Sequence, residues 1–354
     1  MAQPDDITYM RRCLELADRA EGCTAPNPMV GAVVVHQGVI IGEGYHLRAG
    51  TPHAEVHALA AVSDRSLLTG STLYVSLEPC SHHGRTPPCA DLIISSGIRR
   101  VVVGTTDTSP NVAGRGIARL REAGIEVVTG VAEEECRHIN RRFFTWHEKQ
   151  RPWVVLKWAR SADGYIDLDR KAGETAEPHW ITGTTERILV HRWRAAEDAI
   201  LAGGGTVRAD NPSLDVRLWK GKNPLRVIVS RSGAMNPASK VFDGTVDTVL
   251  FTCNEKVSLP GISIVKLACN QYFIEDVLRT LHGMGVQSLF VEGGAFIIRH
   301  FAETGLWDEA RRFTGMMKFG SGVPDQFPGF MPEKSIRFEK SILEIMHHFD
   351  GIPV

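Results

Sequence analysis

Residues 53–89 read HAEVHALAAVSDRSLLTGSTLYVSLEPCSHHGRTPPC and contain one candidate imidazole ligand, His53, and two thiols, Cys80 and Cys89. Three such ligands leave one of the four tetrahedral positions of zinc open, which is the arrangement of a catalytic site. A water molecule at that position would have a pKa of about 7. Glu55 lies two residues after His53 and would carry protons for that water. The stretch therefore predicts a zinc site with Glu55 as its catalytic residue.

The two cysteines are separated by a longer interval than the usual pattern has. The order His-x-Glu followed by Pro-Cys is typical of zinc-dependent nucleobase deaminases, which close the pattern with Cys-x-x-Cys. Here Cys89 follows Cys80 by nine positions, and the turn formers Gly84, Pro87 and Pro88 lie between them. Reduced, buried cysteines are the plainer interpretation of each thiol alone. The ordered set of motifs favours the metal site, and the adjacent histidines at 82 and 83 stay open as alternative ligands.

The string Glu78-Pro-Cys-Ser-His-His-Gly-Arg-Thr-Pro-Pro-Cys89 resembles the zinc segment of the RibD family, the deaminase and reductase proteins of riboflavin biosynthesis. The resemblance covers about residues 5–310. It implies an α/β protein with two domains. Residues 1–148 would form an α/β/α sandwich similar to cytidine deaminase, and residues 149–354 an α/β domain similar to dihydrofolate reductase.

The resemblance also implies two successive reactions with zinc and NADPH as cofactors. The first domain would hydrolyse 2,5-diamino-6-ribosylamino-4(3H)-pyrimidinone 5′-phosphate to remove its 2-amino group. The second would reduce 5-amino-6-(5-phosphoribosylamino)uracil to the ribitylamino product. An alternative is a deaminase of another nucleobase-like substrate with a non-functional reductase domain. The resemblance further implies a homo-oligomer, either a dimer or a tetramer.

Composition is that of an ordinary globular protein with small-molecule substrates. The chain has 354 residues, which favours two domains, with 43% hydrophobic and 23% charged residues. A formal charge of −1 and 7% aromatic residues disfavour a nucleic-acid-binding or membrane-surface protein. No apolar run approaches the roughly 20 residues of a membrane span, and the first six residues lack the features of a signal peptide. Seven cysteines, two of them assigned to metal, favour a reducing cytoplasm.

Residues 1–148 alternate between helical and strand patterns, which predicts a mainly parallel sheet covered on both faces, with only the first strands antiparallel. The expected helices are 8–20, 53–62, 89–96, 116–123 and 133–145, and the expected strands are 31–35, 39–42, 71–77, 98–104 and 126–128.

Substrate contacts in this half are carried over from the family by position. The residues concerned are Asn27, His46, His82, Arg85 and Asp107. Two departures are present. Arg85 stands where Lys is frequent and keeps the cation, whereas Ser109 stands where Asn is frequent and puts one hydrogen bond to substrate in doubt. His46 and Asp107, taken singly, could equally satisfy a local loop.

The second half restarts after a charged linker at residues 147–152. Strands are expected at 153–158, 199–202, 224–230 and 289–291, with helices at 185–196 and from 295. Asp163-Gly164 predicts a hairpin turn. The glycines at 203–205 would let the backbone approach a dinucleotide phosphate, although a tight turn is the plainer interpretation. A Rossmann Gly-x-Gly-x-x-Gly motif does not follow any of these strands, so the NADPH site depends on the resemblance.

The family pattern assigns roles to the polar residues of this half. Expected NADPH contacts are Ala159, Trp180, Thr206, Asp210, Ser230, Gly293 and Gly294, and expected substrate contacts are Arg194, Leu214, Arg217 and Glu292. Arg194 and Arg217 would hold the substrate phosphate, although a solvated position is the alternative for each. Lys157, Asp210 and Glu292 would lie near the reacting sugar carbon as catalytic residues, with their individual roles open.

Three points stay open at this stage. A preference for NADPH over NADH is not decided, and Arg231 after an expected strand is a candidate contact for the 2′-phosphate. Pro178 stands where Ser is frequent in the family. The tail from Met316 does not align with the family pattern.

Overall fold

The computed structural model of the protein describes residues 5–82, 87–109, 112–168, 180–329 and 331–348. The chain divides into two compact units, Met1–Gln150 and Arg151–Val354. The division falls two residues after the boundary expected at 148 and 149. Helix α6 (Arg141–Lys149) explains the difference, because it continues into the segment expected to be a linker.

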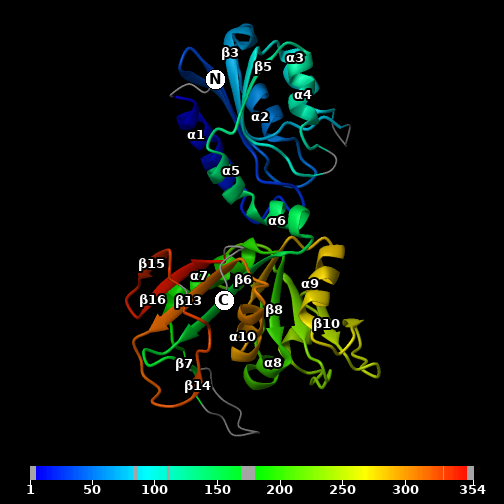
Figure 1. Ribbon diagram of the computed structural model, residues 1–354, viewed down its shortest axis with the longest axis vertical. Coiled ribbons are helices and arrows are strands. Elements are labelled where there is room, and N and C mark those ends of the chain that lie inside the picture. The colour runs from blue at the N-terminus through cyan, green and yellow to red at the C-terminus, as the bar shows by residue number, and fades with distance from the viewer. Residues whose placement is uncertain (1–4, 83–86, 110–111, 169–179, 330, 349–354) are drawn as a thin grey trace. The chain divides into compact units, whose positions relative to one another are not determined.

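Unit 1 contains a five-stranded sheet in the order β2-β1-β3-β4-β5 (Figure 1). Its strands are β1 (Gly31–His36), β2 (Val39–Tyr45), β3 (Ser71–Leu77), β4 (Arg100–Thr105) and β5 (Glu126–Thr129). β3, β4 and β5 run parallel, whereas β1 is antiparallel to both β2 and β3. The antiparallel pairs are confined to the first strands and the last three strands are parallel, as expected. The cause is the crossover through α2 (Ala54–Ala60), which makes β2 and β3 run in the same direction on either side of β1.

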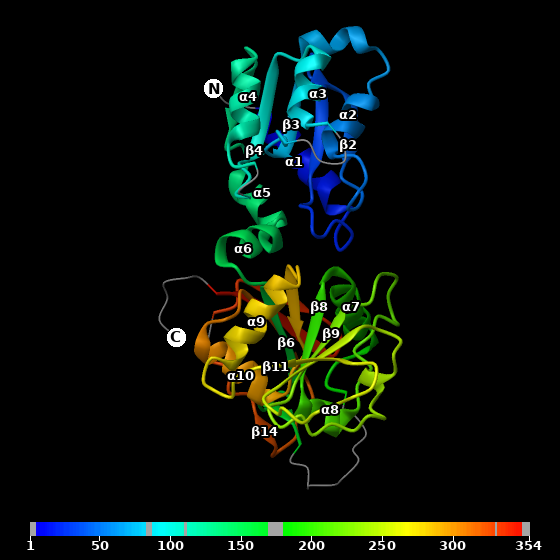
Figure 2. The same ribbon diagram turned by 90° about the vertical axis from the view of Figure 1, so that its right-hand side faces the viewer.

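Helices cover both faces of this sheet (Figure 2). On one face α2, α3 (Cys89–Ser96) and α4 (Arg115–Glu122) pack on alternate strand residues such as Val34 and Leu73. On the other face α1 (Asp6–Asp18) and α5 (Glu133–Ile139) pack on the intervening residues such as Val33 and Tyr74. Because successive strand residues point to opposite faces, each strand supplies both cores. Unit 1 is an α/β/α sandwich.

The single helix expected at 133–145 is two helices, α5 and α6, which meet at Asn140. The Oδ1 atom of Asn140 accepts from the backbone N–H of Met29 at 2.8 Å, and its Nδ2 donates to the Met29 carbonyl at 2.9 Å. This side chain is buried, and the pairing ties the break to a loop far away in the sequence. The helix pattern around Asn140 gives no indication of that partner.

Unit 2 contains a nine-stranded sheet in the order β11-β10-β9-β8-β12-β6-β13-β16-β15. Its strands are β6 (Trp153–Arg160), β8 (Ala199–Gly203), β9 (Leu225–Val229), β10 (Thr248–Thr252), β11 (Ser263–Lys266), β12 (Ser288–Val291), β13 (Glu309–Gly315), β15 (Lys334–Arg337) and β16 (Ser341–His347). All pairs from β11 to β13 are parallel, and β16 and β15 are antiparallel additions at one edge. The unaligned tail after Met316 therefore completes this sheet.

Helices again cover both faces of the sheet in unit 2 (Figure 2). One face packs against α7 (Thr184–Ala196) and α8 (Gly204–Asp210), and the other against α9 (Phe273–Gly283) and α10 (Ala295–Thr304). The carboxyl ends of β6, β8, β9 and β12 lie side by side at one edge. Ligands of open parallel sheets bind at such an edge.

The predicted turn at Asp163-Gly164 forms. The backbone N–H of Ser161 donates to the Tyr165 carbonyl at 2.8 Å, and Gly164 has a φ of +89°. The strand that follows, β7 (Tyr165–Asp167), pairs with β14 (Val323–Pro324) instead of with β6. The predicted turn is confirmed, and a segment late in the chain supplies the strand that pairs with β7.

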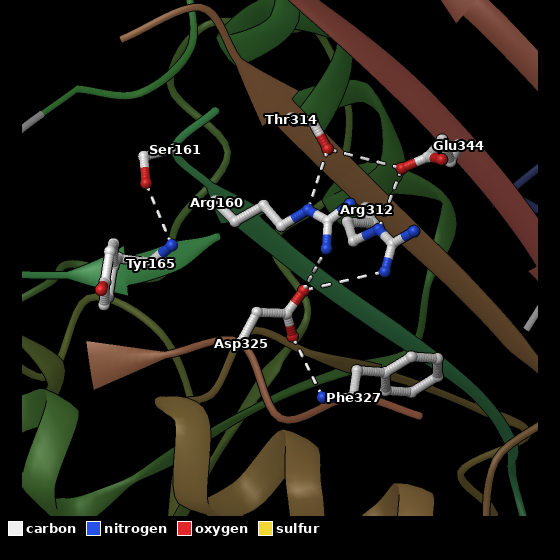
Figure 3. A network of polar contacts seen from close by, with 8 residues as sticks. All are labelled: Arg160, Ser161, Tyr165, Arg312, Thr314, Asp325, Phe327 and Glu344. Atoms are coloured by element: carbon white, nitrogen blue, oxygen red, sulfur yellow. Dashed lines mark hydrogen bonds and ion pairs between the residues drawn. The ribbon is translucent and has the colours of Figure 1, made fainter. Parts of the chain in front are cut away.

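A buried carboxylate holds the segment after β14 in place (Figure 3). One oxygen of Asp325 accepts from Arg160 Nη1 at 3.2 Å and lies 3.7 Å from Arg312 Nη1. The other oxygen accepts from the backbone N–H of Phe327 at 3.1 Å. Glu344 in turn accepts from Arg312 Nε at 2.9 Å. The network links the β7–β14 ribbon to strands β6, β13 and β16.

Candidate active sites

The three candidate metal ligands of unit 1 come together. His53 is the N-cap residue of α2, Cys80 follows β3, and Cys89 is the first residue of α3. The Nδ1 atom of His53 lies 3.6 Å from the Cys80 sulfur and 3.3 Å from the Cys89 sulfur. Ligand atoms around a tetrahedral zinc ion are about 3.6 Å apart. The residues present therefore fit zinc and leave a position open on it.

The two thiols of this cluster have opposite pKa shifts. Hydrogen bonds from Cys89 and His53 outweigh burial and lower the pKa of Cys80 to about 4. The backbone N–H of Cys89 also donates to the Cys80 sulfur at 3.3 Å. The pKa of Cys89 is raised, because its thiol donates to Cys80 and is buried. Thiolates are the form that binds zinc, so metal uptake would release the remaining proton.

Glu55 lies beside the cluster in the first turn of α2. Its side chain is buried, and burial raises its pKa despite the opposing charge of His53. The Cys89 thiol is a hydrogen-bond partner of its carboxyl group. A carboxyl group with a raised pKa beside these ligands can both accept and return a proton.

Asn27 and His46, both predicted substrate contacts, are hydrogen-bonded to each other. The Nδ1 atom of His46 lies 3.1 Å from the Pro52 carbonyl, which can only accept, so Nδ1 carries the proton. His46 Nε2 then accepts from Asn27 Nδ2 at 3.1 Å. Burial lowers the pKa of His46, which favours this neutral form. The His46 ring packs edge-on against the His53 ring, with 5.5 Å between the ring centroids. Asn27 and His46 therefore lie next to the metal ligands.

The other predicted substrate contacts of unit 1 differ in what the structure shows. Asp107 is buried after β4, and its Oδ1 accepts from the backbone N–H of Ser109 at 2.7 Å. His82 is exposed after Cys80 and is not part of the metal cluster, which among the described residues is the one group of three or more His, Cys, Asp or Glu able to hold a metal. Arg85 and His83 lie outside the described residues.

Unit 2 contains a cavity of about 810 Å³ at the carboxyl edge of its sheet. Five of the predicted NADPH contacts line it, namely Thr206, Asp210, Ser230, Gly293 and Gly294. Ala159 on β6 and Trp180 before α7 lie outside this lining. The glycines after β8 do not form a separate turn, because Gly204 begins α8. A side chain on Gly204 would meet Ser230 at 2.9 Å, so this close approach of the start of α8 to the residue after β9 requires glycine.

A charged cluster lies next to this edge. Val291 pairs with Leu156, so Glu292, directly after β12, lies beside Lys157 within the neighbouring parallel strand β6. Arg194 donates to Glu292 from Nε at 2.9 Å and from Nη2 at 2.6 Å. Burial alone would raise the pKa of Glu292, but the charges of Arg194 and Lys157 lower it to about 2. Burial and Arg194 lower the pKa of Lys157, and Glu292 opposes them.

The pairing of Arg194 limits what else it can bind. Its Nη1 also donates to the Asp215 carbonyl at 2.9 Å, so all three guanidinium nitrogens have protein partners. Of five N–H groups, about two are left for a substrate phosphate. Phosphate binding by Arg194 stays a prediction, and holding Glu292 is a role that the sequence did not indicate.

Arg217 and Leu214 lie in the loop that follows α8. The Nη1 of Arg217 donates to Asp215 Oδ1 at 2.5 Å, and its guanidinium is half exposed and accessible to a ligand. Its backbone N–H donates to His191 Nδ1 at 3.2 Å. Burial, together with the charges of Arg194 and Arg217, lowers the pKa of His191 to about 4. His191 was missed from sequence, where it is one residue of a helical pattern. Leu214 is buried in the left-handed conformation, with a φ of +50°.

The two units match different family models. Residues 3–105 match the cytidine and deoxycytidylate deaminase zinc-binding region, and residues 152–341 match the RibD C-terminal domain. The riboflavin biosynthesis protein RibD of Aquifex aeolicus is 39% identical over 352 residues, which covers 97% of this chain and 96% of that protein. The chain belongs to the RibD family.

Further RibD proteins agree with this membership. The Escherichia coli protein is 38% identical over 321 residues, with 86% of each chain covered. The solved deaminase and reductase from Thermotoga maritima superposes with a TM-score of 0.87 at 38% identity and covers 97% of this chain and 99% of its own. Acinetobacter baumannii RibD gives a TM-score of 0.86 at 31% identity, with 98% of this chain and 99% of its own covered.

These matches confirm the expected combination of a cytidine-deaminase-like unit and a RibD reductase unit. Membership of the RibD family makes the chain a bifunctional deaminase and reductase of riboflavin biosynthesis, with zinc and NADPH as its cofactors. None of the helices in the described ranges is long and apolar enough to span a membrane.

Proposed function

We propose that unit 1 hydrolyses the 2-amino group of 2,5-diamino-6-ribosylamino-4(3H)-pyrimidinone 5′-phosphate, and that unit 2 then reduces 5-amino-6-(5-phosphoribosylamino)uracil with NADPH. The solved T. maritima relative is named a deaminase and reductase for compounds of this class. The observation that carries the proposal is the presence of two complete polar centres in one chain. They are the His53, Cys80 and Cys89 cluster beside Glu55, and the Lys157 and Glu292 cluster, in which Glu292 directly precedes Gly293 of the cavity lining.

In the deaminase site, His53, Cys80 and Cys89 would hold zinc, which supplies a water activated at neutral pH. Glu55 would take a proton from the attacking water and pass it to the ring nitrogen as the C2=N double bond of the pyrimidine opens. Glu55 would then move the hydroxyl proton to the 2-amino nitrogen as the bond between C2 and that nitrogen breaks, so that the carbonyl forms and ammonia leaves. The buried, raised-pKa carboxyl group supports this shuttle. Asn27, through its contact with His46, is placed to orient the pyrimidine.

Loss of one thiolate should remove the metal and the first reaction together. For Cys80→Ser we expect less than about a tenth of the wild-type zinc content and no measurable ammonia release, because the site depends on the Cys80 thiolate. NADPH oxidation with the deaminated substrate should persist. Cys23→Ser replaces an exposed cysteine of the same unit and serves as the matched control. Full zinc content in Cys80→Ser, measured by elemental analysis, would exclude Cys80 as a ligand.

In the reductase site, bound NADPH would supply a hydride for C1 of the ribosyl group. Thr206, Ser230 and the glycines after β12 line the cavity that would hold it. As the bond between C1 and the ring oxygen breaks, negative charge develops on that oxygen, which then takes up a proton. Lys157 is the cation that we place there, where it lowers the energy of the developing anion. Glu292 holds Arg194 on the other side of the cluster.

The choice between NADPH and NADH should depend on Arg231. This residue lines the cavity directly after Ser230, with its guanidinium 5.7 Å from the Phe273 ring. A charge-assisted hydrogen bond to a 2′-phosphate contributes about 1.5–3 kcal/mol, so Arg231→Ala should raise the KM for NADPH by about 10–100-fold and leave that for NADH nearly unchanged. Arg208→Ala removes a second cation of the same lining and is the control. An unchanged ratio of the two KM values would reject the assignment.

The substrate assignment is tested by incubating the zinc-loaded protein with the diaminopyrimidinone phosphate and identifying the product by mass spectrometry. Replacement of the 2-amino group by oxygen supports the proposal. Deamination of cytosine or adenine nucleotides in its place would favour the alternative of a different base.

We propose a homo-oligomer, either a dimer or a tetramer, located in the cytoplasm. The oligomer follows from resemblance to the family, and sedimentation velocity measures it directly. The location is supported by the cysteines, all of which are free in the structure.

A further inference from the structure

Glu78 lies between the end of β3 and the metal ligand Cys80, and its carboxylate accepts four backbone hydrogen bonds. One oxygen accepts from the N–H groups of Asp107 at 3.2 Å and Gly114 at 2.9 Å. The other accepts from Gly116 at 2.9 Å and Ile117 at 3.2 Å. The side chain is 4% exposed. Four backbone N–H groups therefore hold this buried carboxylate in one position.

This carboxylate caps helix α4 from outside the helix. The first N–H groups of any helix lack partners within it. The N-cap residue of α4 is Gly114, which has no side chain to supply one. Glu78 supplies the acceptor instead, at the end of the helix dipole that favours negative charge. The start of α4 therefore depends on a residue 36 positions earlier in the chain.

The contact is close enough to set the position of α4. A Cβ atom built on Gly116 would lie 1.8 Å from the carbonyl oxygen of Pro79, so the first turn of α4 rests directly on the residue before Cys80. The backbone N–H of Glu78 also donates to the carbonyl of Thr105, the last residue of β4, at 3.0 Å. Glu78 and Pro79 thus connect the metal-ligand segment to both β4 and α4.

Asp107 is the functional residue that this arrangement places. It is a predicted substrate contact, it is buried, and its backbone N–H is held by Glu78. The same carboxylate lies two residues before Cys80. We propose that Glu78 is a positioning residue of the deaminase site, which fixes Asp107 and the start of α4 relative to the metal ligands. This inference rests on the proposed function of unit 1.

Glu78→Gln is the first test, because it keeps the side-chain volume. One oxygen can still accept hydrogen bonds, but the NH₂ group that replaces the other oxygen faces two backbone N–H donors. We expect the KM for the diaminopyrimidinone phosphate to rise by about tenfold or more, with a smaller change in kcat, since Asp107 would lose its placement. Zinc content and NADPH oxidation with the deaminated substrate should match wild type. Loss of zinc would overturn the proposal, because Glu78 would then support the metal loop alone.

A double-mutant cycle with Asp107→Ala separates positioning from general stability. If Glu78 acts through Asp107, the double variant should have about the same KM as Asp107→Ala alone. If the KM increase in the double variant equals the product of the increases in the two single variants, the proposal is overturned. Asp6→Asn is the matched control, because Asp6 is a buried carboxylate of the same unit bonded to Tyr74 and Arg100. It should lower Tm and leave KM within about twofold of wild type.

Amide hydrogen exchange gives a readout that does not depend on the substrate. In Glu78→Gln, exchange at Gly116 and Ile117 should accelerate by about tenfold or more, because these amides lose a charged acceptor. Unchanged exchange would overturn the proposal. If Glu78→Gln does not fold, Glu78→Asp, which keeps the charge on a shorter side chain, replaces it in both measurements. Absence of ammonia release by wild type would reject the proposed function, and exchange would still decide the role of Glu78.

Discussion

Glu55→Gln is expected to slow ammonia release by about 10²–10⁴-fold, which is the contribution of a placed general acid and base. Glutamine keeps the shape of Glu55 but cannot take up or return the proton. Burial raises the pKa of Glu55 above its ordinary value of 4.5. Wild-type kcat/KM should therefore fall as the pH is lowered through this raised pKa. The group works as a base when deprotonated, so protonation at low pH removes activity. This acid limb should be missing in Glu55→Gln.

Two controls make the Glu55 result specific. Zinc content of Glu55→Gln should match wild type, and its NADPH oxidation with the deaminated substrate should be normal. Glu43→Gln changes a carboxylate of the same unit that pairs with Arg12, and it should release ammonia at the wild-type rate. Ammonia release by Glu55→Gln within about threefold of wild type would place the proton shuttle on another residue.

Lys157→Met should lower kcat for the reduction by about 10²–10³-fold and leave ammonia release unchanged. Removal of one preorganised charge next to a developing anion commonly has an effect of this size. Burial and the charge of Arg194 lower the pKa of Lys157 below its ordinary value of 10.5. The wild-type rate of reduction should therefore fall as the pH rises through this lowered pKa. Deprotonation at high pH removes the cation, and Lys157→Met should not show this alkaline limb.

Lys222→Met is the matched control for Lys157. Lys222 is an exposed lysine of the same unit that pairs with Asp198 at 3.0 Å, and its replacement should leave the reduction unchanged. Reduction by Lys157→Met at the wild-type rate would shift the role of the cation to Arg194. Stopped-flow measurement of NADPH oxidation with excess deaminated substrate isolates this step.

The metal cluster and most elements could be predicted because their signals are local. His53 and Glu55 are two residues apart, and Cys80 comes three residues after an apolar strand pattern that ends at Leu77. Likewise Cys89 was expected to begin a helix, and it does begin α3. In each case neighbouring residues specify the local structure around the ligand.

The interactions that complete both sites could not be predicted, because their partners are distant in sequence. Arg194 and Glu292 are 98 positions apart, and each alone suggested a substrate contact. Sequence position places Glu78 in the zinc motif but does not show the backbone amides of α4 that surround it. The same limit applies after the turn at Asp163, since β7 pairs with the distant strand β14. Pairing across long loops depends on tertiary packing that local patterns do not encode.

The most direct test of two linked activities follows ammonia and NADPH in one reaction that starts from the diaminopyrimidinone phosphate. Without NADPH, wild type should release one ammonia per substrate, and with NADPH, oxidation should begin only after a lag while deaminated product accumulates. Added deaminated substrate should abolish that lag. Zinc-loaded protein that releases no ammonia, or that oxidises NADPH before any ammonia appears, would contradict the proposed order of the two reactions.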